Sequence, residues 1–275
     1  MKFAFSTLAC PKWSVQQVIE NALAMGYDGI EWRLLDGAII DPVRDSTNVI
    51  DAVAACRTHG LDVCALDTSC SFNHADPEVR AKQIEDLLNW VRLAQEVQVP
   101  ILRVFGGKDA QDSSRAPSED TVNAWVADSL RLVAEKIEHF SVTIALETHD
   151  AFSSARRVAT VLQAVNSPHI AALWDSHHPY RMGETAEEVA DILQGHIAHV
   201  HVKDARRDAT DSTGWQLVPL GEGEVPVREQ LHILMRRGYT GYVSVEWEKH
   251  WHPELAEPEI ALPQHIAWLR GTIDK

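Results

Sequence analysis

The stretch Val142-Thr-Ile-Ala-Leu-Glu-Thr-His149 decides the fold. It begins as an apolar run, which is typical of a β-strand that is buried on both faces. It ends in a carboxylate and an imidazole, Glu147 and His149. In parallel α/β folds, binding and catalytic residues lie at the carboxyl ends of the strands. The stretch therefore predicts a buried parallel strand that ends at a functional site.

Seven further strands of this kind are expected on either side, each followed by an amphipathic helix. Cap and stop residues mark the helices; Ser14 begins the first one and Gly26 ends it. The expected strands are 3–6, 28–32, 61–66, 100–105, 142–147, 170–175, 197–202 and 241–246. The expected helices are 14–25, 46–59, 77–98, 118–139, one from 153 or 154, 185–193, 227–237 and 257–269. The stretch 203–226 is expected to be an irregular loop.

Unbroken alternation of strands and helices favours right-handed βαβ units and a parallel sheet. Eight units in 275 residues predict an α/β fold, the closed (β/α)8 TIM barrel with a parallel eight-stranded sheet, as one domain over residues 1–275. An open doubly wound sheet is the alternative. It more often has a Gly-rich phosphate-binding turn after the first strand, and Ser6-Thr-Leu-Ala-Cys-Pro-Lys12 is not one.

Composition narrows the class of protein. The formal net charge of −15 argues against nucleic acid as a partner, because such binding depends on Lys and Arg that neutralise phosphates. No stretch is long and apolar enough to cross a membrane, and the first residues are interpreted as a strand instead of a signal peptide. The four Cys lack CxxC spacing and fit reduced thiols. We therefore expect a cytoplasmic protein with no nucleic-acid or membrane partner.

Four successive strands, the fifth to the eighth, end in residues that can bind a metal ion. They are Glu147, Asp175, His201 and Glu246. Neighbouring carboxylates repel one another unless a cation lies between them. Three oxygen ligands with one nitrogen suit Mn²⁺, Mg²⁺, Co²⁺ or Zn²⁺, and differ from the Cys and His ligands of a structural zinc. A single acid at a strand end is often a helix cap or a solvated charge, but the repeated pattern favours one shared divalent metal ion.

With these residues the chain resembles the xylose-isomerase-like barrels of sugar isomerases and epimerases, which include D-tagatose 3-epimerase, hydroxypyruvate isomerase and inosose dehydratase. The resemblance extends from Gly26-Tyr-Asp-Gly-Ile-Glu-Trp-Arg33 to the final strand. In that family an acid from strand five, an acid from strand six, a His from strand seven and a Glu from strand eight bind one divalent metal ion. The resemblance thus implies as ligands Glu147, Asp175, His201 and Glu246, with Mn²⁺ as the first expectation.

The resemblance also implies two residues that bind substrate. His178 lies three residues after Asp175, and Arg207 lies six residues after His201, where epimerases keep a substrate-binding His and Arg. The alternative for His178 is a solvent-exposed turn residue. The alternative for Arg207 is an ordinary loop charge beside Arg206. The sequence leaves both alternatives open. A homo-oligomer also stays open, since relatives are often dimers or tetramers but no self-complementary patch is evident.

The residue types suggest a mechanism for a sugar or sugar-phosphate isomerase or epimerase. A metal ion would polarise a carbonyl and stabilise an enediolate. Of Glu147 and Glu246, one would remove a carbon-bound proton and the other would return a proton. The same pair suits dehydration, so the alternative function is a metal-dependent dehydratase of the inosose or dehydroshikimate type. The partner is expected to be a small sugar or polyol-derived substrate.

Other rim loops are expected to decide which substrate binds. Aromatic faces suit sugar C–H surfaces, although a Trp more often only packs. Arg33 either binds a substrate carboxylate or phosphate or pairs with Glu31, and Lys203-Asp204 either orients the metal-binding His or anchors a strand end. No phosphate-binding motif is evident. The candidates are Trp13, Glu31, Arg33, Phe72, His74, Arg103, Lys108, His149, Lys203, Trp215 and Trp251.

Two rival functions remain. An endonuclease IV-like DNA-repair enzyme of the same superfamily holds three zinc ions, and needs further His ligands on strands three and four and an Asp-x-His after strand seven. Here strand four ends in Arg103-Val-Phe-Gly-Gly107, and Asp211-Ser-Thr213 has no His. Together with the negative net charge, this disfavours DNA cleavage. A barrel that binds a ligand without catalysis is the second rival.

Overall fold

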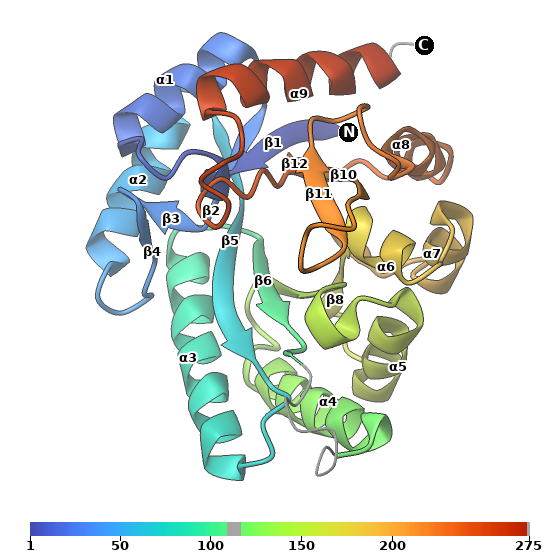
Figure 1. The fold of residues 1–275 in the computed structure, drawn as a ribbon. Coiled ribbons are helices and arrows are strands. Elements are labelled where there is room, and N and C mark those ends of the chain that lie inside the picture. Colours follow the sequence, from blue (N-terminus) through green and yellow to red (C-terminus); the bar gives the residue numbers. More distant parts are fainter. Residues whose placement is uncertain (109–116, 274–275) are drawn as a thin grey trace.

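Eight parallel strands close into a barrel in the computed structural model, which describes residues 1–108 and 117–273 (Figure 1). Their order around the barrel is β1-β12-β9-β8-β7-β6-β5-β2, and each neighbouring pair is parallel. The predicted (β/α)8 TIM barrel is therefore confirmed. The strands are β1 Lys2–Ser6, β2 Gly29–Trp32, β5 Asp62–Ser71, β6 Ile101–Phe105, β7 Thr143–Glu147, β8 Ile170–Asp175, β9 Ile197–Val202 and β12 Tyr242–Val245.

Helices surround the barrel (Figure 1). Local sequence fixes their ends. Ser14 and Gln17 form a capping box at the start of the first helix, and Gly26 ends it with a φ of +83°, which glycine adopts without steric cost. The helices are α1 Val15–Met25, α2 Ser46–Thr58, α3 Pro77–Glu96, α4 Glu119–Lys136, α5 Ala155–Val165, α7 Ala186–Ile192, α8 Val227–Arg236 and α9 Pro258–Ile273. Among the described residues, no helix is long and apolar enough to cross a membrane.

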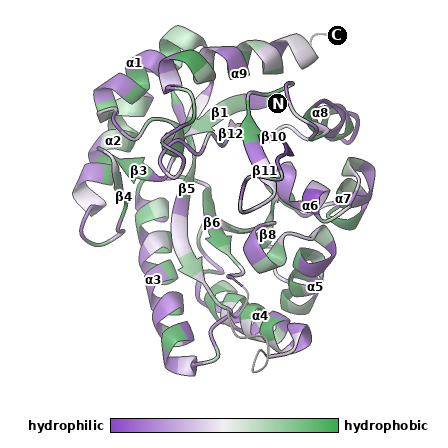
Figure 2. Ribbon diagram, viewed as in Figure 1, coloured by the Kyte–Doolittle hydropathy of each residue, from purple (hydrophilic) through white to green (hydrophobic). Residues whose placement is uncertain are grey.

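The apolar core includes buried residues of the strands and of the helix faces that pack on them. Ile144 and Leu146 of β7 are fully buried, as are Val126 and Leu130 of α4. Figure 2 shows the same division, because β6 is mostly hydrophobic whereas α3 and α4 alternate between hydrophilic and hydrophobic residues. Burial of apolar surface is the main favourable contribution to folding. The charged residues at the strand ends are thus held in a rigid apolar frame.

The loop 203–226 is more regular than predicted. It contains the antiparallel hairpin of β10, Asp204–Arg207, and β11, Trp215–Val218. The Asp204 carboxylate accepts hydrogen bonds from the backbone N–H groups of Gly221, Gly223 and Val225 at 2.9 to 3.1 Å. Asp204 therefore ties the end of this loop to the barrel strand β9. The prediction of an irregular loop was wrong because this long-range anchor has no local sequence signal.

Smaller elements also escaped the sequence pattern. They are the hairpin β3 Leu34–Leu35 with β4 Ala38–Ile39, the short helix α6 His177–Arg181, and the 3-10 turns η1 Thr7–Ala9 and η2 Asp150–Phe152. In addition, β5 continues to Ser71, five residues beyond its predicted end, and β12 ends at Val245, one residue before Glu246. The longer β5 brings Asp67 and Ser69 to the rim where the site lies.

Candidate metal and substrate site

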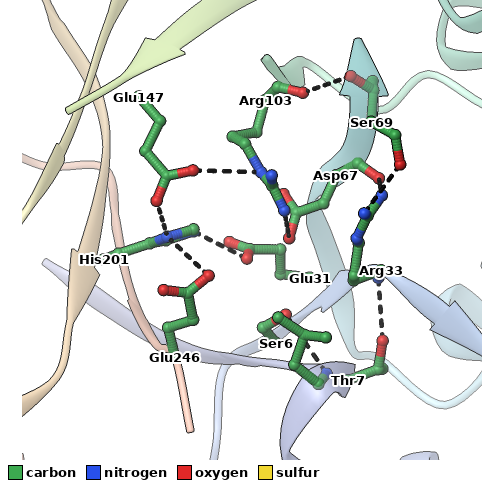
Figure 3. Close-up of polar contacts among 12 residues, drawn as sticks. Ser6, Thr7, Glu31, Arg33, Asp67, Ser69, Arg103, Glu147, His201 and Glu246 are labelled. Atoms are coloured by element: carbon green, nitrogen blue, oxygen red, sulfur yellow. Dashed lines mark hydrogen bonds and ion pairs between the residues drawn. The ribbon is translucent and has the colours of Figure 1, made fainter. Parts of the chain in front are cut away.

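The four predicted metal ligands converge at the carboxyl ends of neighbouring strands. One ligand atom from each residue lies within 4.8 Å of the ligand atoms of the other three. All four side chains are buried, and Figure 3 shows His201 between the carboxylates of Glu147 and Glu246. We call these residues the ligand set, and they are Glu147 of β7, Asp175 of β8, His201 of β9 and Glu246 directly after β12.

The imidazole of His201 presents one nitrogen to this set. Its Nδ1 lies 3.3 Å from Oε1 of Glu147 and 3.5 Å from Oε1 of Glu246. Its Nε2 lies 2.8 Å from Oε1 of Glu31, which is fully buried at β2. A His that binds a metal usually directs its other ring nitrogen to a carboxylate, which fixes the ring. The geometry thus leaves Nδ1 for a cation.

Two buried cations partly offset the charge of the ligand set. The Nζ of Lys203 lies 2.6 Å from Glu246 and 3.2 Å from Asp175, and the Nε of Arg103 lies 3.5 Å from Glu147. Burial raises the pKa of Asp175 to about 6; Lys203 opposes the rise, whereas Glu246 and Glu147 add to it. Burial acts in the same direction on Glu147, but Arg103 and other cations outweigh it and hold the pKa of Glu147 well below its usual range.

The ligand set fits a divalent cation. Oε2 of Glu147 and Oδ2 of Asp175 are buried and accept no hydrogen bond from the described residues; their contacts are the ion pairs with Arg103 at 3.5 Å and Lys203 at 3.2 Å. A divalent cation among these oxygens would use their remaining lone pairs and reduce the repulsion of three carboxylates. Carboxylate oxygens with one imidazole are ligands for Mn²⁺, Mg²⁺, Co²⁺ or Zn²⁺. The donor types therefore agree with the metal predicted from the sequence.

A cavity of about 1010 Å³ opens beside the ligand set. Glu246 lines it, so the proposed metal position is reachable by a ligand in the cavity. The wall combines cationic, hydroxyl and aromatic side chains, among them Arg33, Ser69, Arg103, His149 and Trp251. Such a mixture of polar and aromatic groups suits a small polar molecule with C–H faces.

Two predicted substrate residues, His149 and His178, lie together near this cavity. Their ring centroids are 4.3 Å apart, and His149 lines the cavity. His178 is 6% exposed, so the alternative of a solvent-exposed turn residue is not what the structure shows. Burial, and then the charge of Lys203, lower the pKa of His178, so its ring is neutral at pH 7. Neither ring nitrogen of His178 has a hydrogen-bond partner in the described residues, and its contact with substrate stays a prediction.

Arg207 and Trp13 are not brought to the cavity among the residues described. Arg207 lies on β10, is exposed, and places its guanidinium 5.0 Å from the ring centroid of Trp215. The buried indole of Trp13 donates a hydrogen bond of 2.9 Å to Glu259 of α9. Substrate binding by either residue remains an untested prediction, and this placement does not support it.

Two buried residues near the ligand set were missed from the sequence. Nε2 of His199 lies 2.5 Å from Oε2 of Glu31, and Oδ2 of Asp67 lies 3.3 Å from Arg103. Residues two apart on a strand share a face, so the pattern His-Val-His in β9 could have placed His199 beside His201. Asp67 directly follows Leu66, the predicted end of the strand, and lies within β5, which continues to Ser71.

Comparison with known proteins identifies relatives. A family model described as xylose isomerase-like TIM barrel matches residues 19–272. Fructoselysine 3-epimerase of Escherichia coli O157:H7 is 23% identical over 257 residues, covering 90% of this chain and 90% of the relative. Inosose isomerase of Bacillus velezensis is 23% identical over 247 residues, covering 85% and 83%. The crystal structure of the IolI protein with a bound zinc atom matches with a TM-score of 0.81 at 20% identity, covering 100% and 98%, which shows the shared fold.

Proposed function

The chain belongs to the xylose isomerase-like TIM barrel family, and on this premise we propose that it is a divalent-metal-dependent isomerase or epimerase of a small sugar. The observation that carries the proposal is the ligand set, in which one buried ligand atom from each of four residues lies within 4.8 Å of the others. The similarity to a 3-epimerase and an inosose isomerase supports the reaction class.

The ligand set would hold the cation, with Mn²⁺ as the first expectation. When bound, such a cation supplies a Lewis acid that polarises a substrate carbonyl and stabilises negative charge on its oxygen. The chain itself fixes the donor atoms before substrate arrives. Glu31 directs Nδ1 of His201 to the site, and the backbone N–H groups of His177 and His178 donate to Oδ1 of Asp175 at 2.7 and 3.1 Å.

Proton transfer is assigned to Glu147 and Glu246. One carboxylate accepts the proton from the carbon next to the substrate carbonyl, and the electron pair of that C–H bond forms the C=C bond of an enediolate. The other carboxyl group then gives a proton to the opposite face or to the neighbouring carbon. Arg103 holds the pKa of Glu147 below its usual range against the effect of burial, so this residue is ionised at pH 7. Positioned acid–base groups contribute about 10² to 10⁴ in rate.

Deuterium exchange tests this assignment. The Mn²⁺-loaded protein would be incubated in D₂O with ketoses, hydroxypyruvate and inososes, and substrate C–H signals followed by proton NMR. For the substrate that exchanges, Glu147→Gln and Glu246→Gln are each expected to lower the rate by about 10² to 10⁴. Product absorbance is read in parallel, because loss of water by a dehydratase would yield an ultraviolet-absorbing enone and epimerisation would not.

Glu248→Gln is the matched control. Glu248 also lines the cavity and lies 2.7 Å from Lys203, but it is outside the ligand set. The exchange rate of the Glu248→Gln variant is expected to stay within about tenfold of wild type, since the substitution removes neither the proposed acid nor the proposed base. Metal content, measured on every variant, separates loss of the acid–base group from loss of the ion. If Glu147→Gln and Glu246→Gln both exchanged the substrate proton at the wild-type rate, the acid–base assignment would be wrong.

A further inference from the structure

Arg33 is a buried guanidinium at the cavity wall without an anionic partner. It follows β2, is 5% exposed and lines the cavity. Its NH1 donates to the backbone carbonyl of Asp67 at 3.1 Å and its NH2 to the hydroxyl of Ser69 at 2.9 Å, so both acceptors are neutral (Figure 3). Within residues 1–108 and 117–273, no carboxylate forms an ion pair with Arg33.

The other buried Lys and Arg side chains of the described chain are all paired with carboxylates. Arg103 pairs with Asp67 and Glu147, and Lys203 and Lys249 each have at least one acidic partner within 3.0 Å. Buried charges in proteins are generally paired, since an unpaired one loses its hydration without compensation. Arg33 is therefore an exception that calls for an anion from outside the chain.

Glu31 does not fill this role, although it is two residues away. Its carboxylate is held by His199 at 2.5 Å and by His201 at 2.8 Å. The sequence left open whether Arg33 pairs with Glu31 or with a ligand, and the structure excludes the first. Burial, and then the neighbouring Arg103, lower the pKa of Arg33 to about 10, although the charges of Asp67, Glu246 and Glu147 oppose the fall, so the guanidinium remains charged at pH 7.

We propose that Arg33 binds an anionic group of the substrate, a carboxylate or a phosphate, so that the substrate is an acidic sugar. The inference rests on the proposed function and names its substrate class. Arg33 and Glu246 line the same cavity, so one molecule reaches both the acidic-group site and the ligand set. The planar guanidinium matches the oxygens of either anion in a bidentate geometry.

The neighbouring wall supports an anion at this place. Ser69 and Ser71 line the cavity on the β5 side, and their hydroxyl groups are neutral hydrogen-bond donors. Arg103 lines the same cavity and adds positive potential, although its own charge is shared with Asp67 and Glu147. The volume of about 1010 Å³ accommodates a sugar together with its acidic group.

Binding of matched ligands tests the proposal. Isothermal titration calorimetry of the Mn²⁺-loaded protein would compare D-tagatose with D-tagaturonate and D-tagatose 6-phosphate, and D-fructose with its uronate and 6-phosphate. At least one acid is expected to bind about 10- to 100-fold more tightly than its neutral ketose, the range for hydrogen bonds to a charged group. Whether the uronate or the 6-phosphate binds more tightly identifies the preferred anion as a carboxylate or a phosphate.

Variants of Arg33 assign that preference to one side chain. Arg33→Met is expected to abolish the advantage of the acid while neutral ketose binding changes little, and Arg33→Lys to keep part of it, because it keeps charge without the planar fork. Arg33→Gln serves if the Met variant does not fold. Lys108→Met is the control, since Lys108 lines the same cavity but is exposed.

The proposal is overturned if no acid binds more tightly than its neutral ketose, or if the advantage of the acid survives in Arg33→Met and Arg33→Gln. Loss of the advantage in Lys108→Met as large as in Arg33→Met would also overturn it, because the preference would then reflect general potential. The titration reports affinity, whereas the deuterium-exchange assay reports proton transfer. The outcome is therefore independent of whether Glu147→Gln stops deuterium exchange.

Discussion

The two halves of the barrel rim use buried charge in different ways. Strands β7, β8, β9 and β12, here the ligand half, direct their terminal side chains to one point, the ligand set. Strands β2, β5 and β6, here the supporting half, carry Glu31, Asp67 and Arg103, which contact each other or members of the ligand set. The ligand half therefore presents donor atoms to a cation. The supporting half fixes the orientation of those donor groups and balances their charge.

This difference explains why some buried charges are tolerable without any ligand and others are not. Arg103 contacts Asp67 and is neutralised within the chain by the carboxylate of Glu147. Arg33, beside it in the supporting half, has only neutral acceptors among the described residues. Removal of one member of a buried pair is strongly destabilising, whereas removal of an unpaired charge is not. The two arginines thus give the sharpest test of the comparison.

Arg103→Met is expected to have the largest effect on stability. It leaves Glu147 buried without its cation, and such a loss costs about 3 to 5 kcal/mol of unfolding free energy. Urea unfolding of chelator-treated protein measures this. With Mn²⁺ present the loss should be smaller, because a cation at the ligand set would compensate Glu147. An equal loss with and without the metal would contradict the support that we assign to Arg103.

Arg33→Met is the matched control for this measurement. The two arginines are neighbours with similar burial, 5% and 1% exposed, and differ mainly in their partners. Replacing an unpaired buried charge with an apolar side chain is expected to leave stability unchanged or to raise it. A loss as large as that of Arg103→Met would show that Arg33 is paired within the chain after all, and would weaken the contrast.

Glu31→Gln tests whether the supporting half orients the ligand half. Glu31 contacts Nε2 of His201 and lies outside the ligand set. Loss of a carboxylate behind a metal-binding His lowers metal affinity by about 10- to 100-fold. Competition with a fluorescent chelator measures the Mn²⁺ affinity directly. Glu248→Gln, which removes a partner of Lys203 but not of His201, should change it much less. Equal Mn²⁺ affinities of wild type and Glu31→Gln would contradict the role of Glu31 in orienting His201.

The convergence of the four side chains in the ligand half was predicted from the sequence, whereas the contacts of the supporting half were not. The barrel and the ends of β7, β8 and β9 followed from apolar runs that stop in a charged residue. Asp67 was missed because the predicted strand ended at Leu66, one residue before it. The continuation of β5 to Ser71 depends on pairing with β6. Partners in the supporting half are set by three-dimensional proximity, such as that of Glu31 to His199, 168 residues apart. No local pattern reveals such pairs.

The two substrate residues that the family resemblance implied, His178 and Arg207, differ in their distance from the barrel and in whether they lie near the cavity. His178 lies three residues after the end of β8 and near the cavity, within the short helix α6. Arg207 lies on the hairpin β10–β11, whose path depends on the anchor Asp204. A fixed spacing from a ligand predicts position well only while the chain stays close to the barrel. This is why the spacing of Arg207 from His201 did not bring it to the cavity.

The last predicted effect is a difference in pH dependence between Asp67 and Glu147. Burial raises the pKa of Asp67 to about 8, although Arg103 opposes the rise, so its neutral form is favoured in the folded state. Glu147 has a pKa below its usual range. The stabilising contribution of Asp67 is therefore present below its unfolded pKa and is lost as the pH rises through about 8. That of Glu147 is present above its unfolded pKa and is lost as the pH falls.

Asp67→Asn isolates this contribution, since Asn resembles the neutral carboxyl group and does not titrate. Between pH 5 and 8, the unfolding free energy of metal-free wild type should fall relative to the variant, by at most about 1.4 kcal/mol per pH unit for one proton. Urea unfolding of both proteins at several pH values gives this difference. A constant difference across the range would mean that Asp67 is ionised when folded. Both arginines would then have a buried carboxylate nearby, and only the direct pairing of Arg103 would still distinguish it from Arg33.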